Sequence, residues 1–114
     1  MLAKLNRIHG RNVFKRILQS GKIARSDQIS LNYSRSRGRN LKAAVVISRK
    51  VAKSSVKRNR IRRRIYEIVR KNYLPLDLKY NLIFIVYSED IDLLSHDELV
   101  VRLDGLMKKA ELIA

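Results

Sequence analysis

Basic residues are concentrated between Ser54 and Asn72, where eight of nineteen residues are lysine or arginine and Glu67 is the only acidic residue. Six of the eight are arginines, and a planar guanidinium matches phosphate oxygens and base edges better than an ammonium does. No regular pattern of opposite charges along the segment neutralises it. We expect this segment to bind a polyanion, and RNA is the leading candidate.

The same segment contains an apolar pattern that predicts an anchored helix. Four apolar residues fall within about 100° of a helical wheel, the width of a stripe that faces a core: Ile61, Ile65, Ile68 and Val69. Arg62 and Tyr66 lie at one margin of this stripe, and Arg58 lies in the first turn, where we expect its side chain to reach into the preceding loop. The remaining arc is polar: Lys57, Asn59, Arg60, Arg63, Arg64, Arg70 and Lys71. The partial positive charge of the helix N-terminus adds to the attraction for phosphate.

Other kinds of chemistry have weaker support in the sequence. A metal-dependent nuclease needs clustered carboxylates, and the acidic run SEDID (residues 88–92) is better interpreted as a loop between a strand and a helix. His9 and His96 have no recognisable nucleophile or orienting partner. The chain has no cysteine, hence neither a disulfide nor a thiolate metal site, which favours a cytoplasmic location. We therefore expect neither catalytic nor metal-binding residues in the chain.

Charge is distributed very unevenly along the 114 residues, whose formal net charge is +16. Residues 1–71 contain 22 basic and 2 acidic residues, whereas residues 72–114 contain 4 basic and 8 acidic ones. One part of the molecule is thus expected to face a polyanion and another is not. The length predicts a single domain over residues 1–114. No apolar run approaches the ~20 residues of a membrane span, and the first residues lack the apolar core of a signal peptide.

The remaining patterns predict an α+β sandwich of one sheet and helices, in the order αβββαβα or αββαβα. A short helix carries Val13, Phe14, Ile17 and Leu18 on one face and ends at Gly21. Strands are predicted at 27–34, 41–48 and 80–88, of which the first two would form a hairpin around a basic turn at 35–40 and the third is apolar enough to be covered on both faces. Pro75 ends the basic helix, and Ser95 and Glu98 begin the last helix with capping-box spacing.

Two long segments resemble the family of bacterial ribonuclease P protein subunits. They are SVKRNRIRRRIYEIVR (55–70), preceded by VISRKVAKS (46–54), and NRIHGRNVFKRILQSGK (6–22). The family hallmark is an Arg-Asn-Arg helix followed by further basic residues. The resemblance implies that an RNA subunit performs the hydrolysis with Mg²⁺ bound at the level of the RNA or holoenzyme. It implies a protein cofactor that binds this RNA and the 5′ leader of precursor tRNA without a further protein partner, and a fold with a left-handed βαβ crossover, although right-handed crossovers dominate.

The resemblance also implies roles for individual residues. Contacts with the catalytic RNA are expected from the Arg-Asn-Arg motif, its upstream loop and the following basic pair: Arg49, Lys50, Lys53, Lys57, Arg58, Asn59, Arg60, Arg62 and Arg63. Asn59 is expected to fix the helix start by hydrogen bonds. A cleft for the leader is expected between the first helix and the sheet, and its residues are Arg11, Phe14, Lys15, Leu18, Asn32, Tyr33 and Tyr66. Plain core packing is an equally good interpretation of Phe14.

Three positions depart from the family pattern. Leu18 stands where many members have a second Phe, Ala52 where many have Gly, and Tyr66 where an Arg usually completes the basic row.

Two other classes of protein are alternatives to this family. A ribosomal protein or general RNA chaperone would use the same charge asymmetry without a cleft for a single strand, and a helix-turn-helix DNA-binding protein would need two adjacent helices where strands are predicted here.

Overall fold

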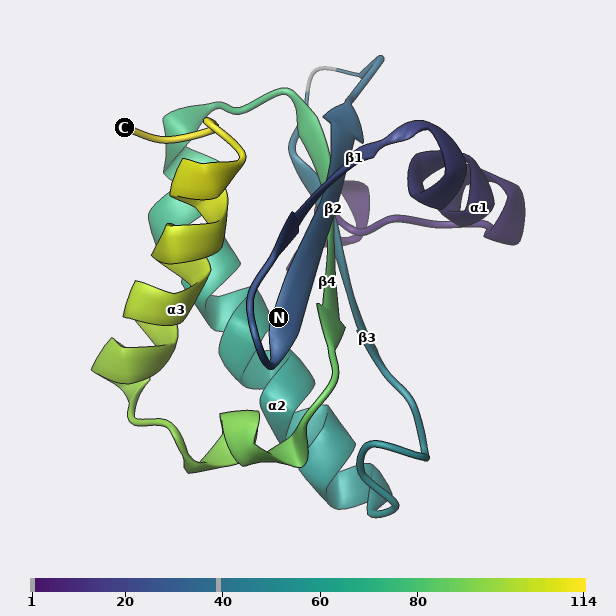
Figure 1. Ribbon diagram of the computed structural model, residues 1–114. Coiled ribbons are helices and arrows are strands. Elements are labelled where there is room, and N and C mark those ends of the chain that lie inside the picture. Colours follow the sequence, from purple (N-terminus) through teal and green to yellow (C-terminus); the bar gives the residue numbers. More distant parts are fainter. Residues whose placement is uncertain (1, 39) are drawn as a thin grey trace.

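The computed structural model describes residues 2–38 and 40–114, and in these ranges it contains three α-helices and a four-stranded sheet (Figure 1). The helices are α1 (Arg11–Ser20), α2 (Ser55–Ile68) and α3 (His96–Lys109). The strands are β1 (Lys22–Arg25), β2 (Ile29–Arg35), β3 (Lys42–Ile47) and β4 (Tyr80–Val86). The α+β class is confirmed, with the longer of the two predicted element orders, αβββαβα.

The sheet order is β1-β2-β4-β3, so β4 lies between β2 and β3. Strand β2 pairs antiparallel with β1 and β4, whereas β3 pairs parallel with β4, with Val45 opposite Phe84. The predicted hairpin between residues 27–34 and 41–48 is therefore wrong. The most apolar strand, β4, takes a central position where both faces of the sheet are shielded, and this separates the two strands. The predicted turn at 35–40 includes Arg39, which lies outside the described residues.

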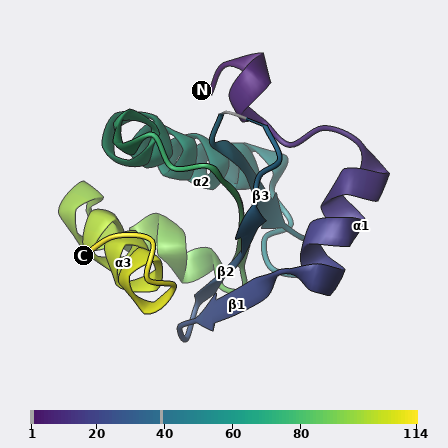
Figure 2. The same ribbon diagram turned by 90° about the horizontal axis from the view of Figure 1, so that it is seen from above.

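The β3–α2–β4 unit joins two adjacent parallel strands through a helix on one face of the sheet. Viewed from the side of α2 with both strands pointing up, β4 lies to the left of β3, as Figures 1 and 2 together show. The crossover is therefore left-handed, against the general preference for right-handed connections. Its consequence is that the basic helix α2 packs across β3 and β4, next to the sheet edge formed by β3.

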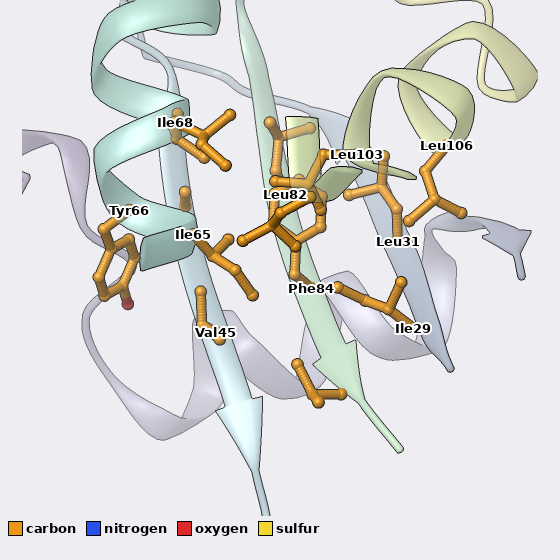
Figure 3. Packing of buried hydrophobic residues seen from close by; sticks show 14 of the residues in the cluster. Ile29, Leu31, Val45, Ile65, Tyr66, Ile68, Leu82, Phe84, Leu103 and Leu106 are labelled. Carbon is orange, nitrogen blue, oxygen red and sulfur yellow. The ribbon is translucent and has the colours of Figure 1, made fainter. Parts of the chain in front are cut away.

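Helices α2 and α3 cover one face of the sheet and α1 lies on the other (Figure 2). The predicted stripe of α2 is confirmed, because Ile61, Ile65, Ile68 and Val69 are each at most 1% exposed. Figure 3 shows Ile65 and Ile68 directed toward the strand residues Val45 and Leu82. The apolar side of α2 is thus fixed in the core, which leaves its charged side facing outward.

The alternation along β2 predicts that its polar side chains face water, but on the face of the sheet that carries α1 two of them are buried. Ile29 and Leu31 point into the main core as expected, but Ser30 and Asn32 on the opposite side are also buried. Helix α1 packs against β2 and shields part of this face, and the Ser30 hydroxyl lies 3.1 Å from the Tyr87 hydroxyl. Both faces of β2 are therefore shielded from water.

The predicted helix ends are confirmed at α2 and α3. Helix α2 passes into a π-helical turn (Val69–Tyr73) and a 3₁₀ turn that contains Pro75, after which the chain leaves the helical direction. At the start of α3, the Ser95 hydroxyl accepts a hydrogen bond from the Glu98 amide, and the Glu98 carboxylate accepts one from the Ser95 amide. This capping box satisfies amides that have no partner within the helix.

Substitution of Gly21 by alanine is expected to destabilise the fold. A Cβ atom at this position would lie 2.5 Å from the carbonyl oxygen of Ile17 and 2.7 Å from that of Tyr33, and both are backbone atoms. Forced contacts of this kind cost about 1–3 kcal/mol in the free energy of unfolding, which urea denaturation measures. Gly105→Ala in α3 is the matched control, because an added Cβ there meets nothing within 4 Å. That change should stabilise the protein by about 0.5–1 kcal/mol. Equal effects of the two substitutions would contradict this close approach of α1 and β2.

Candidate nucleic-acid interface

One side of α2 presents two cations and an amide, Arg62, Arg63 and Asn59, which are here called the open flank. With Val56 these residues line a shallow hollow of about 490 Å³. The Arg62 guanidinium donates a hydrogen bond of 2.8 Å to the Asn59 side-chain oxygen. The expectation that Asn59 fixes the helix start is wrong, since the Ser54 hydroxyl accepts the hydrogen bond from the Lys57 amide there. Asn59 instead orients Arg62 on the outer surface.

The loop before α2 adds three exposed cations to this side, namely Arg49, Lys50 and Lys53. Arg58 holds the loop in place, because its guanidinium donates to the carbonyl oxygens of Ala52 at 2.7 Å and Lys53 at 2.9 Å. The expected escape of the Arg58 side chain into the preceding loop is confirmed. Ala52 itself is buried, so its departure from the family pattern is accommodated within the core.

The other side of α2, here called the latched flank, meets a 3₁₀ turn (Glu89–Leu93) that follows β4. The Arg60 guanidinium donates to both carboxylate oxygens of Asp92, at 3.0 Å and 3.1 Å from its Nε. Arg64 lies 3.7 Å from the same carboxylate and donates to the carbonyl oxygen of Asp92 at 3.0 Å. Lys57 lies 3.8 Å from Glu89. Two of the three acidic residues of the SEDID run, Glu89 and Asp92, thus contact the basic helix.

This contact corrects one inference from the sequence. Glu67 is not the only acid within reach of the α2 cations, because the fold brings Asp92 and Glu89 to them from a distant part of the chain. The interpretation of SEDID as the connection between a strand and a helix is confirmed. Arg64, which sequence reasoning left out of the site, is a structural residue of the latched flank. The opposite net charges of residues 1–71 and 72–114 were the available signal for such a contact.

The latched flank also changes the ionisation of its acid. Hydrogen bonds from Arg60 hold the pKa of the Asp92 carboxyl below its ordinary value, and the same pair raises the pKa of Arg60. The Asp92 side chain is only 10% exposed, but that of Arg60 is 48% exposed, so water partly screens the pair. On the outer surface, a hydrogen bond from Arg70 likewise lowers the pKa of Glu67. Both acids are therefore carboxylates at neutral pH.

The predicted contacts with a catalytic RNA fall into two groups. Arg58, Arg60 and Lys57 already have protein partners. Across residues 2–38 and 40–114, five predicted cations have no carboxylate within ion-pair distance: Arg49, Lys50, Lys53, Arg62 and Arg63. The second group lies on the open flank of α2 and on the loop that precedes the helix.

The residues predicted for a leader cleft are only partly brought together. Phe14 and Leu18 are half-buried on α1, Arg11 and Lys15 are exposed on the same helix, and Asn32 on β2 faces α1. Tyr33 points to the other face of the sheet, where its ring centroid lies 6.4 Å from that of Tyr80. Tyr66 is 6% exposed on α2 and belongs to the core, again across the sheet from α1 (Figures 2 and 3). Neither tyrosine shares a cleft with Phe14, because the alternation of β2 and the wheel of α2 direct them away from it.

Two further observations concern metal sites and membrane-spanning helices. Within the described part of the chain, no group of three or more His, Cys, Asp or Glu side chains is arranged to hold a metal ion. Of the helices in the same ranges, none is long and apolar enough to cross a membrane.

The mixed sheet with an arginine-rich helix on one face defines a small basic protein of the RNA-binding class. A family model described as ribonuclease P matches residues 2–111, and the chain belongs to this family. Its function is that of a protein component of ribonuclease P, the endoribonuclease that processes the 5′ end of tRNA, and it has an RNA partner.

Two relatives support the assignment. The chain is 33% identical over 119 aligned residues to the ribonuclease P protein component of Synechococcus sp. (strain JA-2-3B'a(2-13)), covering 99% of this chain and 87% of that protein. It is 30% identical over 100 residues to the same component of Chloroflexus aurantiacus (strain ATCC 29366 / DSM 635 / J-10-fl), covering 88% and 73%.

Solved structures confirm the fold. The ribonuclease P protein of Staphylococcus aureus superposes with a TM-score of 0.80 at 20% identity, covering 96% of this chain and 98% of that one. The protein from Thermotoga maritima superposes with a TM-score of 0.79 at 21% identity, covering 90% and 96%. The α+β architecture is thus that of known ribonuclease P proteins.

The latched flank predicts a particular response to acid. Because the pKa of Asp92 is lowered in the folded state, its stabilising contribution is present above the unfolded value of about 3.9 and is lost as the pH falls through the lower folded value. Asp92→Asn should therefore lower stability at pH 6 and reduce the further loss between pH 6 and pH 3, measured by urea unfolding. Asp90→Asn, on the same turn but exposed, is the control and should change neither quantity much. Equal stability of the two variants at both pH values would show that the contact between Asp92 and Arg60 contributes nothing to the free energy of unfolding.

Proposed function

We propose that the open flank of α2 and its preceding loop bind the RNA subunit of ribonuclease P, and that the surface beside α1 holds the 5′ leader of precursor tRNA. The observation that carries the proposal is the difference between the two flanks of one helix. Asp92 and Glu89 pair with Arg60 and Lys57, whereas in residues 2–38 and 40–114 Arg62 and Arg63 have no carboxylate within ion-pair distance. A single-sided row of free arginines is what the phosphate backbone of a folded RNA requires.

The overall charge supports a tightly held RNA rather than an occasional one. A net charge of +16 on a 114-residue chain creates self-repulsion that a bound polyanion relieves. The core stripe of α2 fixes the helix, so the arginines of the open flank are presented from a rigid element. Rigid presentation reduces the entropy lost on binding. We propose that residues 1–114 act in this way as a single RNA-binding domain in the cytoplasm.

Hydrolysis is assigned to the RNA subunit, with Mg²⁺ bound at the level of the RNA or holoenzyme. A protein nuclease would need free carboxylates to hold the metal ion and to organise the attacking water. The most enclosed carboxylate of the SEDID run, that of Asp92, already accepts hydrogen bonds from Arg60. The chain's own contribution is therefore to bind and orient the RNA and its substrate.

Leader binding is supported by the surroundings of Phe14. Phe14 is half-buried on α1, with the exposed cations Arg11 and Lys15 on the same helix. A partly accessible aromatic ring beside cations suits a single strand, because a base stacks on the ring while the phosphates meet the cations. Leu18 provides apolar contact next to it but lacks the π-face of a phenylalanine.

Arg63→Ala is expected to weaken binding to ribonuclease P RNA and to reduce the salt dependence of that binding. One lost phosphate contact should lower the slope of log K against log salt by about 0.7–0.9. Filter binding of the intact chain to the RNA at several salt concentrations measures this slope. Lys108→Ala removes one exposed cation from α3 and is the control, which should leave the slope unchanged. If the two variants behave alike, net charge and not the open flank governs binding.

Phe14→Ala is expected to act only on substrates that carry a leader. Loss of one stacked base should weaken the free energy of binding of the reconstituted enzyme to precursor tRNA by about 1–3 kcal/mol. Its affinity for mature tRNA should stay the same. Fluorescence titration with both RNAs measures this difference. A change in stability alone, with equal affinity for both RNAs, would mean that Phe14 is a packing residue.

A further inference from the structure

A second groove lies on the α1 side of the sheet, between α1 and the connection from β2 to β3. Its volume is about 330 Å³, and its walls come from one flank of α1, the end of β2, the start of β3 and Asn81 of β4. The residues that line it are Val13, Arg16, Ile17, Ser20, Ser34, Arg35, Ser36, Arg37, Gly38, Lys42 and Asn81. The sequence motifs do not mark this site, because its residues come from four separate segments.

The groove is strongly basic and contains no acid. Four of its lining residues are cations, Arg16, Arg35, Arg37 and Lys42, and none is a carboxylate. In the described ranges, none of these four side chains has a carboxylate within ion-pair distance. Four like charges around so small a volume repel one another unless an anion enters. This differs from the latched flank of α2, where the chain provides its own anions.

Neutral hydrogen-bonding groups of the groove are held in place by local contacts. The Asn81 amide donates to the Ser34 hydroxyl at 3.4 Å, which leaves the hydroxyl proton of Ser34 free to donate. The Ser36 hydroxyl accepts a hydrogen bond from the Gly38 amide at 3.2 Å, which forms a tight turn at the rim. The groove therefore offers oriented O–H donors beside its cations, a combination that suits phosphate oxygens.

The groove is separate from both surfaces of the proposed function. Helix α2 covers the opposite face of the sheet (Figure 2). On α1, Val13, Arg16, Ile17 and Ser20 follow the i, i+3, i+4, i+7 spacing of one flank, whereas Phe14 and Leu18 lie on the other flank. Buried Ile17 fixes α1 on the sheet between them. Helix α1 thus divides this side of the molecule into two separate surfaces.

A hollow of about 540 Å³ shares Ser20, Ser34 and Arg35 with the groove and continues it past the C-terminal end of α1 to the other face of the sheet, where Lys109 and Ala110 at the end of α3 also line it. This hollow contains Lys22 and the paired rings of Tyr33 and Tyr80, which are tilted by 51°. Among the described residues that line this hollow, Glu111 is the acidic one. Aromatic rings next to a cationic groove favour a single strand, whose bases are free to stack, over a duplex.

We propose that the groove between α1 and the β2–β3 connection binds the phosphate backbone of a single-stranded RNA segment. Arg16, Arg35 and Lys42 contact successive phosphates, and Ser34 donates to a phosphate oxygen. The bases follow the shared wall toward Tyr33 and Tyr80. The site goes beyond the proposed function, since no residue of the open flank and neither Phe14 nor Leu18 lines it.

The test compares two double variants of equal charge in the full chain. Arg16→Ala with Lys42→Ala removes two cations from the groove, and Arg25→Ala with Lys108→Ala removes two exposed cations elsewhere. The probe is a fluorescent uridylate hexamer, and anisotropy at several salt concentrations gives the affinity and its salt slope. Loss of two contacts should lower the slope by about 1.4 and the affinity at 0.1 M salt by about 25-fold. The control pair should change neither much, and unfolding curves establish that each variant is folded.

Each outcome decides the proposal. A reduced slope in the groove variant alone supports it, even if the open flank later proves not to bind ribonuclease P RNA. Equal changes in both double variants, or no change in either, would overturn it. A 10-base-pair RNA duplex serves as the second probe, and an equally large loss of duplex affinity in the groove variant would overturn the assignment to a single strand.

Discussion

The ion pairs of Asp92 with Arg60 and Arg64 determine which side of α2 carries unpaired positive charge. They join the acidic C-terminal part of the chain to the most basic helix, and they offset part of the positive charge on one side of that helix. The opposite side has no such partner among the described residues, so Arg62 and Arg63 are left for an external anion. The proposed RNA-binding surface thus depends as much on where the chain places its few acids as on where it places its many arginines.

The left-handed β3–α2–β4 crossover explains why this arrangement is possible. It packs α2 across β3 and β4, with the isoleucine stripe in the core and the two charged flanks on either side. Strand β4 then leads directly into the turn that contains Asp92. A single helix therefore contributes to the core, to an internal ion-pair cluster and to an outward cationic surface. On the other face of the sheet, α1 separates the Phe14 surface from the groove at Arg16 and Lys42 in a similar way.

Local patterns predicted most of the elements but not their pairing. The stripe of α2, the capping box of α3 and the break at Pro75 depend on residues close in sequence, so spacing alone reveals them. The hairpin between β2 and β3 was wrong because β4, from a distant segment, competes for the same strand edges. For the site, the wheel of α2 predicted which basic side chains lie outside the core, whereas the contact of Asp92 with Arg60 and the burial of Tyr66 depend on segments far apart in sequence. The groove beside α1 was missed for the same reason.

The central claim is that this chain assists a catalytic RNA rather than cleaving RNA itself. The most direct test mixes the purified chain with a ribonuclease P RNA and precursor tRNA at low Mg²⁺ concentration and follows release of the 5′ leader. We expect leader removal only when both the chain and the RNA subunit are present. Cleavage by the chain alone, or no stimulation of the RNA by the chain, would contradict it.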